Sequence, residues 1–178
     1  MLASTLTEVH FEQAALVRAA QGGDRAAFGS LYEQYARMVH GILLAHVCYA
    51  DAEDLVQDVF VRAMQQLSSL RDPTAFGGWL AAIARRFAVD LHRKHRPALD
   101  SRDAPGGSRP DREAFEVLDV LRNLPKAYRE TLILRLVEGM TGPEIAVRTG
   151  LTPESVRVNL CRGMKLLRQA LGKESRDE

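Results

Sequence analysis

The sequence predicts an all-α fold of two small helical domains joined by a flexible linker. Apolar residues recur at spacings of three and four over long windows, without the sustained alternation typical of strands. Residues 97–111, PALDSRDAPGGSRPD, contain three Pro, two Gly and two Ser, and Leu99 is their only large apolar residue. Such a segment cannot bury enough surface to offset the entropy lost on ordering, so we expect a linker there.

The first domain, expected over residues 1–96, contains three segments with helical patterning. Asp24 is a suitable N-cap, and the helix after it carries an apolar stripe of Phe28, Leu31, Tyr35, Val39 and Ile42. A second helix is expected from Asp51, whose carboxylate can accept hydrogen bonds from first-turn amides. A third follows the N-cap Asp72 with Pro73 at its first position, and its apolar stripe is Phe76, Leu80, Ile83, Phe87 and Leu91.

The second domain is expected over residues 112–178. Helices are predicted at about 112–122 and from Pro125 to about 138, followed by the two short helices of TGPEIAVRTGLTPESVRVNLCRG, residues 141–163. Because the sequence stops soon after the last of these helices, we expect no further C-terminal sensory domain.

Local signals in residues 141–163 agree on a helix-turn-helix. Thr141 and Glu144 fit a capping box, in which hydroxyl and carboxylate each satisfy a backbone N–H. Gly150 can adopt the left-handed conformation that ends a helix. Thr152 can then cap the second helix and Pro153 can open it. The small core that fixes the angle between the two helices is expected to comprise Ile145, Ala146, Leu151, Val156 and Leu160.

The second of these helices is suited to the major groove of DNA. In such motifs the N-terminal residues of the second helix contact base edges, and basic residues further along contact bases or phosphates. The corresponding residues here are Glu154, Ser155, Arg157, Val158, Arg162 and Lys165. The alternative is an ordinary αα-hairpin with a solvated basic face.

Charge is distributed unevenly along the chain, although the formal net charge is only +1. Residues 51–60 contain four acids and no Lys or Arg, whereas residues 85–96 and 153–173 each contain five basic residues and one acid. The start of the chain has no cationic segment followed by an apolar run, and GILLAHV (41–47) is too short to cross a bilayer. We therefore expect a cytoplasmic protein.

The first domain combines an acidic helix with features that suit unpaired bases. Residues 51–62 place acids on one face and apolar residues on another, which a solvated amphipathic helix would also explain. Downstream, a short polar loop and the aromatic pair Phe76 and Trp79 precede a basic helix. Unpaired bases need stacking surfaces and cations close together. Core packing is the alternative for both aromatic rings.

Three segments in this order resemble the alternative bacterial sigma factors of the extracytoplasmic function (ECF) class, group IV of the sigma-70 family. They are DAEDLVQDVFVRA, FGGWLAAIARRFAVDLHRK and LRNLPKAYRETLILRLVEGMTGPEIAVRTGLTPESVRVNLCRGMKLLRQAL. The resemblance spans both helical domains. It implies a sigma-2-like domain over residues 1–96 and a sigma-4-like domain with the helix-turn-helix over residues 112–178.

The resemblance also implies three interfaces. The acidic helix would meet the basic clamp helices of core RNA polymerase through Asp54, Leu55, Gln57, Asp58 and Phe60. The loop at 68–74 and the basic helix would bind the −10 element through Ser69, Leu70, Arg71, Asp72, Phe76, Arg85, Arg86, Arg93 and Lys94. The recognition helix would bind the −35 element through Glu154, Ser155, Arg157, Val158, Cys161, Arg162 and Lys165. Asp90 lies four residues from both Arg86 and Lys94, so local neutralisation of that basic face is expected.

The implied partners are core RNA polymerase, promoter DNA and a cognate anti-sigma factor, with no direct membrane insertion. Polymerase would supply most of the nonspecific DNA affinity, which accounts for a net charge near zero. The implied role is non-catalytic and needs no cofactor. The sequence departs from common family patterns at Met64, Arg86, Asn159 and Met164, so promoter preference is not transferred from relatives.

Two rival functions make different predictions. A conventional helix-turn-helix regulator would bind duplex operators independently of polymerase, as a dimer on two half-sites. A metal-dependent enzyme could use pairs drawn from His40, His46, Cys48, His92 and His95. However, no HExxH motif or Gly-rich phosphate loop accompanies them, and Cys48 and Cys161 form no CxxC motif. We therefore expect no metal site and no enzymatic activity.

Overall fold

The computed structural model describes residues 2–94 and 117–174, and all regular structure within these ranges is helical. This confirms the all-α prediction. The expected linker at 97–111 and the first residues of the helix expected at 112–122 lie outside the described ranges.

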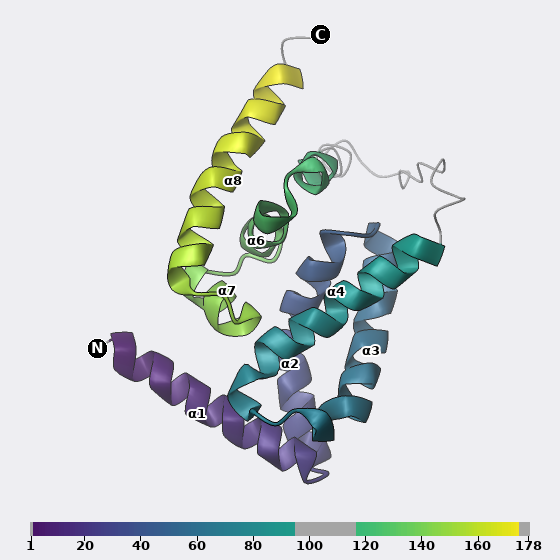
Figure 1. Cartoon of the computed structure of the whole chain (residues 1–178), viewed down its shortest axis with the longest axis vertical. Coiled ribbons are helices and arrows are strands. Elements are labelled where there is room, and N and C mark those ends of the chain that lie inside the picture. Colours follow the sequence, from purple (N-terminus) through teal and green to yellow (C-terminus); the bar gives the residue numbers. More distant parts are fainter. Residues whose placement is uncertain (1, 95–116, 175–178) are drawn as a thin grey trace.

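The N-terminal group of helices consists of α1 (Leu2–Gln21), α2 (Arg25–Leu44), α3 (Tyr49–Gln66) and α4 (Phe76–Lys94). Two short 3₁₀ turns, η1 (Leu67–Ser69) and η2 (Pro73–Ala75), connect α3 to α4. Figure 1 shows α2, α3 and α4 side by side, and α1 ends at the turn that leads into α2 and packs against α2 and η2. Helix α1 was not among the elements expected from the sequence.

The helix starts in this group follow local chemistry with one exception. Asp24 accepts hydrogen bonds from the N–H groups of Ala26 and Ala27, as predicted for an N-cap. Asp72 likewise accepts from the Thr74 N–H and opens η2, which leads directly into α4. The predicted start of α3 at Asp51 is wrong by two residues. The helix begins earlier, at Tyr49, and no side chain caps it.

The C-terminal group contains a helical segment at 117–123, α6 (Lys126–Leu136), α7 (Gly142–Thr149) and α8 (Pro153–Glu174). The predicted capping box of Thr141 and Glu144 is present in full. Gly150 ends α7 at φ 73°, in the left-handed region expected for it. The Thr152 hydroxyl accepts from the Ser155 N–H at 3.1 Å and so caps α8. These observations confirm the helix-turn-helix.

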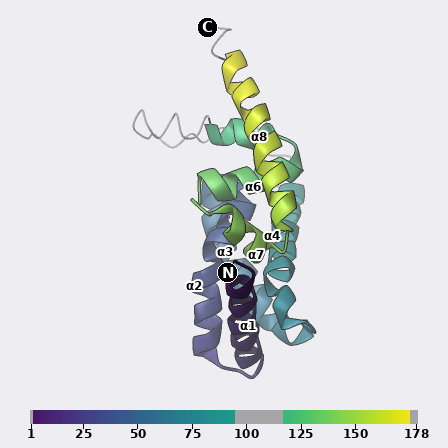
Figure 2. The ribbon, with the colours of Figure 1, turned by 90° about the vertical axis from the view of Figure 1, so that its left-hand side faces the viewer.

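Helix α8 packs closely on α6 and then extends past the other helices, as both views show (Figures 1 and 2). The close approach depends on Gly163, where a Cβ atom would lie 2.9 Å from the Leu132 side chain. Over its first turns, the side of α8 that faces away from α6 is open to solvent.

The two groups pack against each other and share one hydrophobic core. Helix α6 lies against α2, and α7 lies against both α2 and α4. Buried residues from both groups, among them Ile42 and Leu80 from the first and Leu134 and Ile145 from the second, belong to a single cluster. This arrangement places α4, which carries several of the predicted DNA-binding residues, next to the helix-turn-helix.

Candidate nucleic-acid and protein interface

The acidic face of α3 is exposed. Asp54, Gln57 and Asp58 are solvent-exposed, and Leu55 is half-buried beside them. Phe60 differs, because its ring packs against Phe28 and Tyr32 at centroid separations of 6.3 and 4.6 Å, and only 3% of the residue is exposed. The structure thus exposes the carboxylates to solvent and keeps Phe60 in the core.

A groove of about 600 Å³ runs between α3 and α4. Its apolar lining comes from the inner faces of the two helices, and charged residues from both helices border it. The apolar lining residues include Leu55, Trp79, Ile83, Phe87 and Leu91, and the charged ones are Asp58, Arg62, Arg86 and Asp90. Trp79 is therefore a half-buried wall of a surface groove, while its neighbour Phe76 is fully buried.

The predicted −10 loop is held in shape by hydrogen bonds at both of its ends. The Gln21 amide of α1 donates to the carbonyls of Leu67 and Leu70, at 3.0 and 2.8 Å. The N–H and hydroxyl of Thr74 donate to Asp72 Oδ1, at 3.0 and 2.7 Å, and these bonds lower the pKa of Asp72 below its usual value. Within this ordered loop Ser69 and Arg71 are exposed.

Two residues predicted for this loop and the helix after it lie in the core. Leu70 is 9% exposed, and Phe76 is 0% exposed, with its ring against Tyr35 at 5.1 Å. Neither side chain can reach a base unless the core opens. Like Phe60, they lie beneath the predicted interface and do not form part of its surface.

The basic residues of α4 have different surroundings. Arg93 is exposed, and its Nη2 lies 4.0 Å from Asp90 Oδ1 within the same helix, a pairing that the sequence did not predict. Arg86 is exposed at the groove. Arg85 is half-buried and forms an ion pair with Glu130 of α6. The side chain of Lys94 lies outside the described part of the chain.

The recognition face of α8 is open. All of the predicted residues except Val158, which is half-buried, are exposed: Glu154, Ser155, Arg157, Cys161, Arg162 and Lys165. Among the described residues of this face, Arg157 and Glu154 form an ion pair at 3.6 Å, and each side chain is at least 80% exposed. Such a pair is weak and easily exchanged for a phosphate or a base edge.

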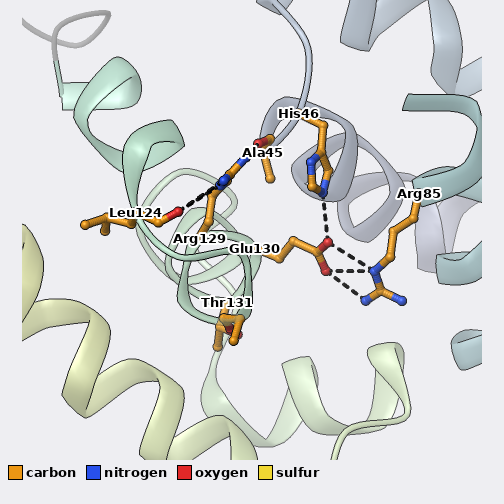
Figure 3. A network of polar contacts seen from close by, with 8 residues as sticks. Ala45, His46, Arg85, Leu124, Arg129, Glu130 and Thr131 are labelled. Atoms are coloured by element: carbon orange, nitrogen blue, oxygen red, sulfur yellow. Dashed lines mark hydrogen bonds and ion pairs between the residues drawn. The ribbon is translucent and has the colours of Figure 1, made fainter. Parts of the chain in front are cut away.

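A polar network crosses between the two groups of helices at Glu130 of α6 (Figure 3). Its carboxylate accepts two hydrogen bonds from the Arg85 Nε, at 2.9 and 3.1 Å, and one from Arg85 Nη2 at 2.8 Å. His46 Nε2 lies 2.9 Å from the same carboxylate. Burial raises the pKa of Glu130, but the hydrogen bonds from His46 and Arg85 outweigh it and leave the pKa below its usual value.

Further cross-contacts surround this network. Arg129 donates to the Ala45 carbonyl at 3.1 Å, and Arg122 donates to the Leu44 carbonyl at 3.0 Å. His40 Nδ1 lies 2.7 Å from Glu138. Arg148 of α7 lies over the Tyr35 ring, with its guanidinium 5.0 Å from the ring centroid. Each of these contacts joins a residue after 117 to α2 or the turn that follows it.

Comparison with known proteins gives two family matches, one to each group of helices. The family model described as sigma-70 region 2 matches residues 31–98, and that described as sigma-70, region 4 matches residues 114–167. The chain is 33% identical over 160 residues to the RNA polymerase sigma factor CarQ of Myxococcus xanthus, an alignment that covers 84% of this chain and 92% of CarQ. This chain belongs to the sigma-70 family, in its ECF class.

Two further relatives extend the comparison of this sigma factor. The ECF RNA polymerase sigma-E factor of Haemophilus influenzae is 29% identical, over 86% of this chain and 92% of that protein. The solved structure of CnrH in complex with the cytosolic domain of CnrY has 26% sequence identity and a TM-score of 0.64, and it covers 90% of this chain and 97% of that chain. The resemblance inferred from the three sequence segments is confirmed.

Sequence reasoning about this sigma factor missed Glu130, Arg129 and Gln21. Glu130 had a usable signal, because it lies three and four residues from Ile133 and Leu134 on a helix face that is otherwise apolar. A charge in such a position usually has a partner. No sequence pattern indicates that the partner is Arg85, which is 45 residues away.

Among the residues considered for a metal site, His40 and His46 each lie beside a glutamate. His40 and His46 face the carboxylates of Glu138 and Glu130, and Cys48 is exposed. Within residues 2–94 and 117–174, no three His, Cys, Asp or Glu side chains converge on one point. The structure does not describe the side chain of His92 or any part of His95. None of the helices described in these ranges has the length and apolar character needed to cross a bilayer.

Proposed function

We propose that the protein is an alternative sigma factor that binds core RNA polymerase and directs promoter-specific initiation through −10 and −35 elements. The observation that carries this proposal is the joint match to regions 2 and 4, with exposed acidic and basic faces on the corresponding helices. The proposed domains are 1–96 for polymerase and −10 binding, 97–111 as a linker, and 112–178 for −35 binding. The role is non-catalytic, and the place of action is the cytoplasm.

The polymerase-binding surface in this proposal is the exposed face of α3. Asp54 and Asp58 provide negative charge, Gln57 provides a hydrogen-bonding amide, and Leu55 provides apolar contact at the edge of the groove. A basic surface on the polymerase would be attracted to this face. Charges of opposite sign at an interface contribute chiefly to the association rate and to register.

The −10 surface consists of the loop between α3 and α4 together with the basic face of α4. Ser69, Arg71 and Asp72 lie on the exposed loop, where a displaced base could bind. Backbone phosphates would be held by arginines and a lysine further along: Arg85, Arg86, Arg93 and Lys94. Phosphate contacts of this kind position the strand without specifying its sequence.

The −35 surface is the open side of α8. Its N-terminal residues would enter the major groove and contact base edges, as recognition helices do. Arg157 can donate two hydrogen bonds to a guanine, whereas Arg162 and Lys165, one and two turns further along, would contact phosphates or flanking bases. The cap at Thr152 fixes the direction in which this helix starts.

An anti-sigma protein is proposed as the regulatory partner. CnrH, which shares this fold over nearly all of its length, was solved in complex with the cytosolic domain of CnrY. A protein that covers the α3 face or the groove beside it would block polymerase binding. Recovery of only polymerase in a sensitive pull-down from unstimulated native cells would contradict this part of the proposal.

In vitro transcription tests the proposed function directly. Bacterial core polymerase is incubated with and without the protein on a library of random promoter fragments, and start sites are mapped. Enrichment of start sites that share two short upstream elements supports a sigma factor. An absence of protein-dependent initiation, together with direct duplex binding without polymerase, would contradict the proposal and favour a conventional regulator.

A further inference from the structure

The last turn of α1 reaches a loop that the proposed function assigns to DNA. The loop between α3 and α4 contains the exposed residues Ser69 and Arg71, and α1 packs against both of its 3₁₀ turns, η1 and η2. Gln21, the last residue of α1, donates from its side-chain amide to the carbonyls of Leu67 and Leu70, which are 46 and 49 residues away. One side chain thus ties the start of the loop to a helix that is distant in the sequence.

Only the nitrogen of the Gln21 amide can make both contacts. A carbonyl oxygen accepts hydrogen bonds and cannot donate them, whereas the amide nitrogen carries two hydrogens. Each hydrogen is therefore donated to one of the two loop carbonyls, and the orientation of the amide follows from its partners. A carboxylate, a thioether or an alkyl group at this position would have no such donors.

The segment that Gln21 holds has little backbone support of its own. Turn η1 contains three residues, and 3₁₀ hydrogen bonds have poorer geometry than those of an α-helix. Its own bonds are local: the Leu70 N–H donates to the Leu67 carbonyl at 3.1 Å, and the Ser69 hydroxyl donates to the Gln66 carbonyl at 2.6 Å. The side chains of Leu67 and Leu70 are buried beneath the turn. The amide of Gln21 adds a fixed point outside the loop.

A second residue of α1 affects the other end of the loop. Thr74 donates two hydrogen bonds to Asp72, and these are the main cause of the lowered pKa of Asp72. The positive charge of Arg18, three residues before Gln21, lowers that pKa further. Residues three apart lie on the same side of a helix. One side of α1 therefore acts on both ends of the loop.

We propose that Gln21 is a positioning residue of the −10 surface, whose amide holds the loop backbone in the form that presents Ser69 and Arg71 to a displaced base. The inference rests on the proposed function, because it takes this loop to bind the −10 element. Gln21 is half-buried, and both of its donors are used within the protein. It acts through the loop and not by contact with DNA.

A loop that is ordered in advance favours selective contact with a base. Such a loop loses less conformational entropy when DNA binds, so more of the interaction energy is retained as affinity. Bases are distinguished by hydrogen bonds whose donors and acceptors have to be placed accurately. If the loop backbone moves, Arg71 can still contact a phosphate, but its preference for one base over another falls. The expected defect is therefore a loss of −10 sequence preference.

Gln21→Met and Val17→Ala form the matched pair of variants. Methionine resembles glutamine in length and helix propensity but has no N–H donor, so Gln21→Met removes both hydrogen bonds and leaves α1 able to form. Val17, one turn earlier in α1, is fully buried, so Val17→Ala weakens the packing of α1 and keeps the amide in place. Circular dichroism melts verify folding, and Gln21→Asn, whose amide is one methylene shorter, carries the test if Gln21→Met is unfolded.

Hydrogen exchange tests whether the amide orders the loop, in the full chain without polymerase or DNA. Mass spectrometry follows exchange in peptides that cover residues 67–72. We expect Gln21→Met to accelerate exchange there by about tenfold or more, because two hydrogen bonds are lost. Val17→Ala should act mainly on peptides of α1. Unchanged exchange of the loop in Gln21→Met would overturn the proposal.

Initiation with core polymerase tests the effect on sequence preference. The template library has a fixed −35 element and a randomised −10 element, and start sites are counted for the unmodified protein and both variants. Gln21→Met should reduce the enrichment of the preferred −10 sequence by about fivefold or more, whereas Val17→Ala should retain it. An equal reduction in both variants would overturn the proposal, since Gln21 would then act only through the packing of α1.

The outcomes separate this inference from the proposed function. If Gln21→Met accelerates exchange of the loop but keeps the full −10 preference, the amide orders the loop without positioning it for DNA. The inference is then wrong, and initiation still proceeds as proposed. If the unmodified protein supports no initiation, the proposed function fails and this inference fails with it, whatever the exchange shows.

Discussion

Arginines of α4 and α8 illustrate two ways in which one protein holds the residues proposed to bind DNA. On α8, Arg157 projects into solvent and has only an exposed partner within its own helix. On α4, Arg85 is half-buried and is held by the carboxylate of Glu130, which belongs to α6. The residue type is the same, but the first is open to solvent and the second is held between the two groups of helices. Exposure, and not the presence of a basic residue, therefore distinguishes the two surfaces.

The largest expected effect comes from the core that positions α4. Phe76→Ala removes a fully buried ring that contacts Tyr35 and Trp79, and should lower the free energy of unfolding by about 3–5 kcal/mol. Val158→Ala, on the half-buried side of α8, should cost less than about 1 kcal/mol. Urea denaturation followed by circular dichroism measures both. Similar losses for the two variants would remove the contrast between the two helices.

Removal of each arginine should sharpen the comparison. Arg85→Ala leaves Glu130 partly buried with His46 as its remaining partner, so we expect a loss of about 1–3 kcal/mol in the free energy of unfolding. Arg157→Ala removes an exposed pair and should change that free energy by about 0.5 kcal/mol or less. The same denaturation experiment applies. An equal loss from both changes would show that the Glu130 contact contributes no more than a surface pair.

Acid should weaken the Glu130 contact. Because the pKa of Glu130 is lower in the folded protein than its ordinary value of 4.5, its contribution to stability is present above that value and is lost as the pH falls through the folded pKa. The groups that face the carboxylate are Arg85 and His46. Glu130→Gln should therefore lose less stability than the unmodified protein as the pH falls below the ordinary pKa of 4.5. Parallel pH curves would contradict this assignment.

The smallest effect concerns a local feature of the helix-turn-helix. Thr141→Ala removes the hydroxyl that accepts from the Glu144 N–H and should cost about 1 kcal/mol. Since α7 supports both α8 and the contact with α4, thermal melts should show a small decrease in the melting temperature. Ser155→Ala is the comparison variant: it removes the hydroxyl that accepts from the Thr152 hydroxyl but keeps the N–H that Thr152 caps, so it should have a smaller effect. A larger effect for the control would place the critical cap at α8.

Local chemistry explains which parts of the fold were predictable. The caps at Asp24, Asp72 and Thr141 act within four residues, so their sequence signals were sufficient. The start of α3 was misplaced because Tyr49 begins the helix without a side-chain cap. Helix α1 had no cap signal of this kind, and its existence was not inferred.

The candidate interfaces were predictable to a different extent. Exposed residues such as Asp54 and Arg162 follow from their helix faces, and the structure leaves them accessible. Burial of Phe60 and Phe76 depends on how the helices pack together, which periodicity alone does not determine. The pairing of Arg85 with Glu130 depends on the relative placement of two domains, and no local pattern encodes that placement.

The hydrogen bonds from Gln21 have a consequence for domain exchange between relatives. The match to region 2 begins at residue 31, yet the carbonyls of Leu67 and Leu70 are held by an amide ten residues before it. A chimera joined at residue 31 would inherit the loop without the side chain that fixes its backbone. Transplanting the loop with its geometry intact requires a junction before Gln21, so the unit that fixes the loop is longer than the matched segment.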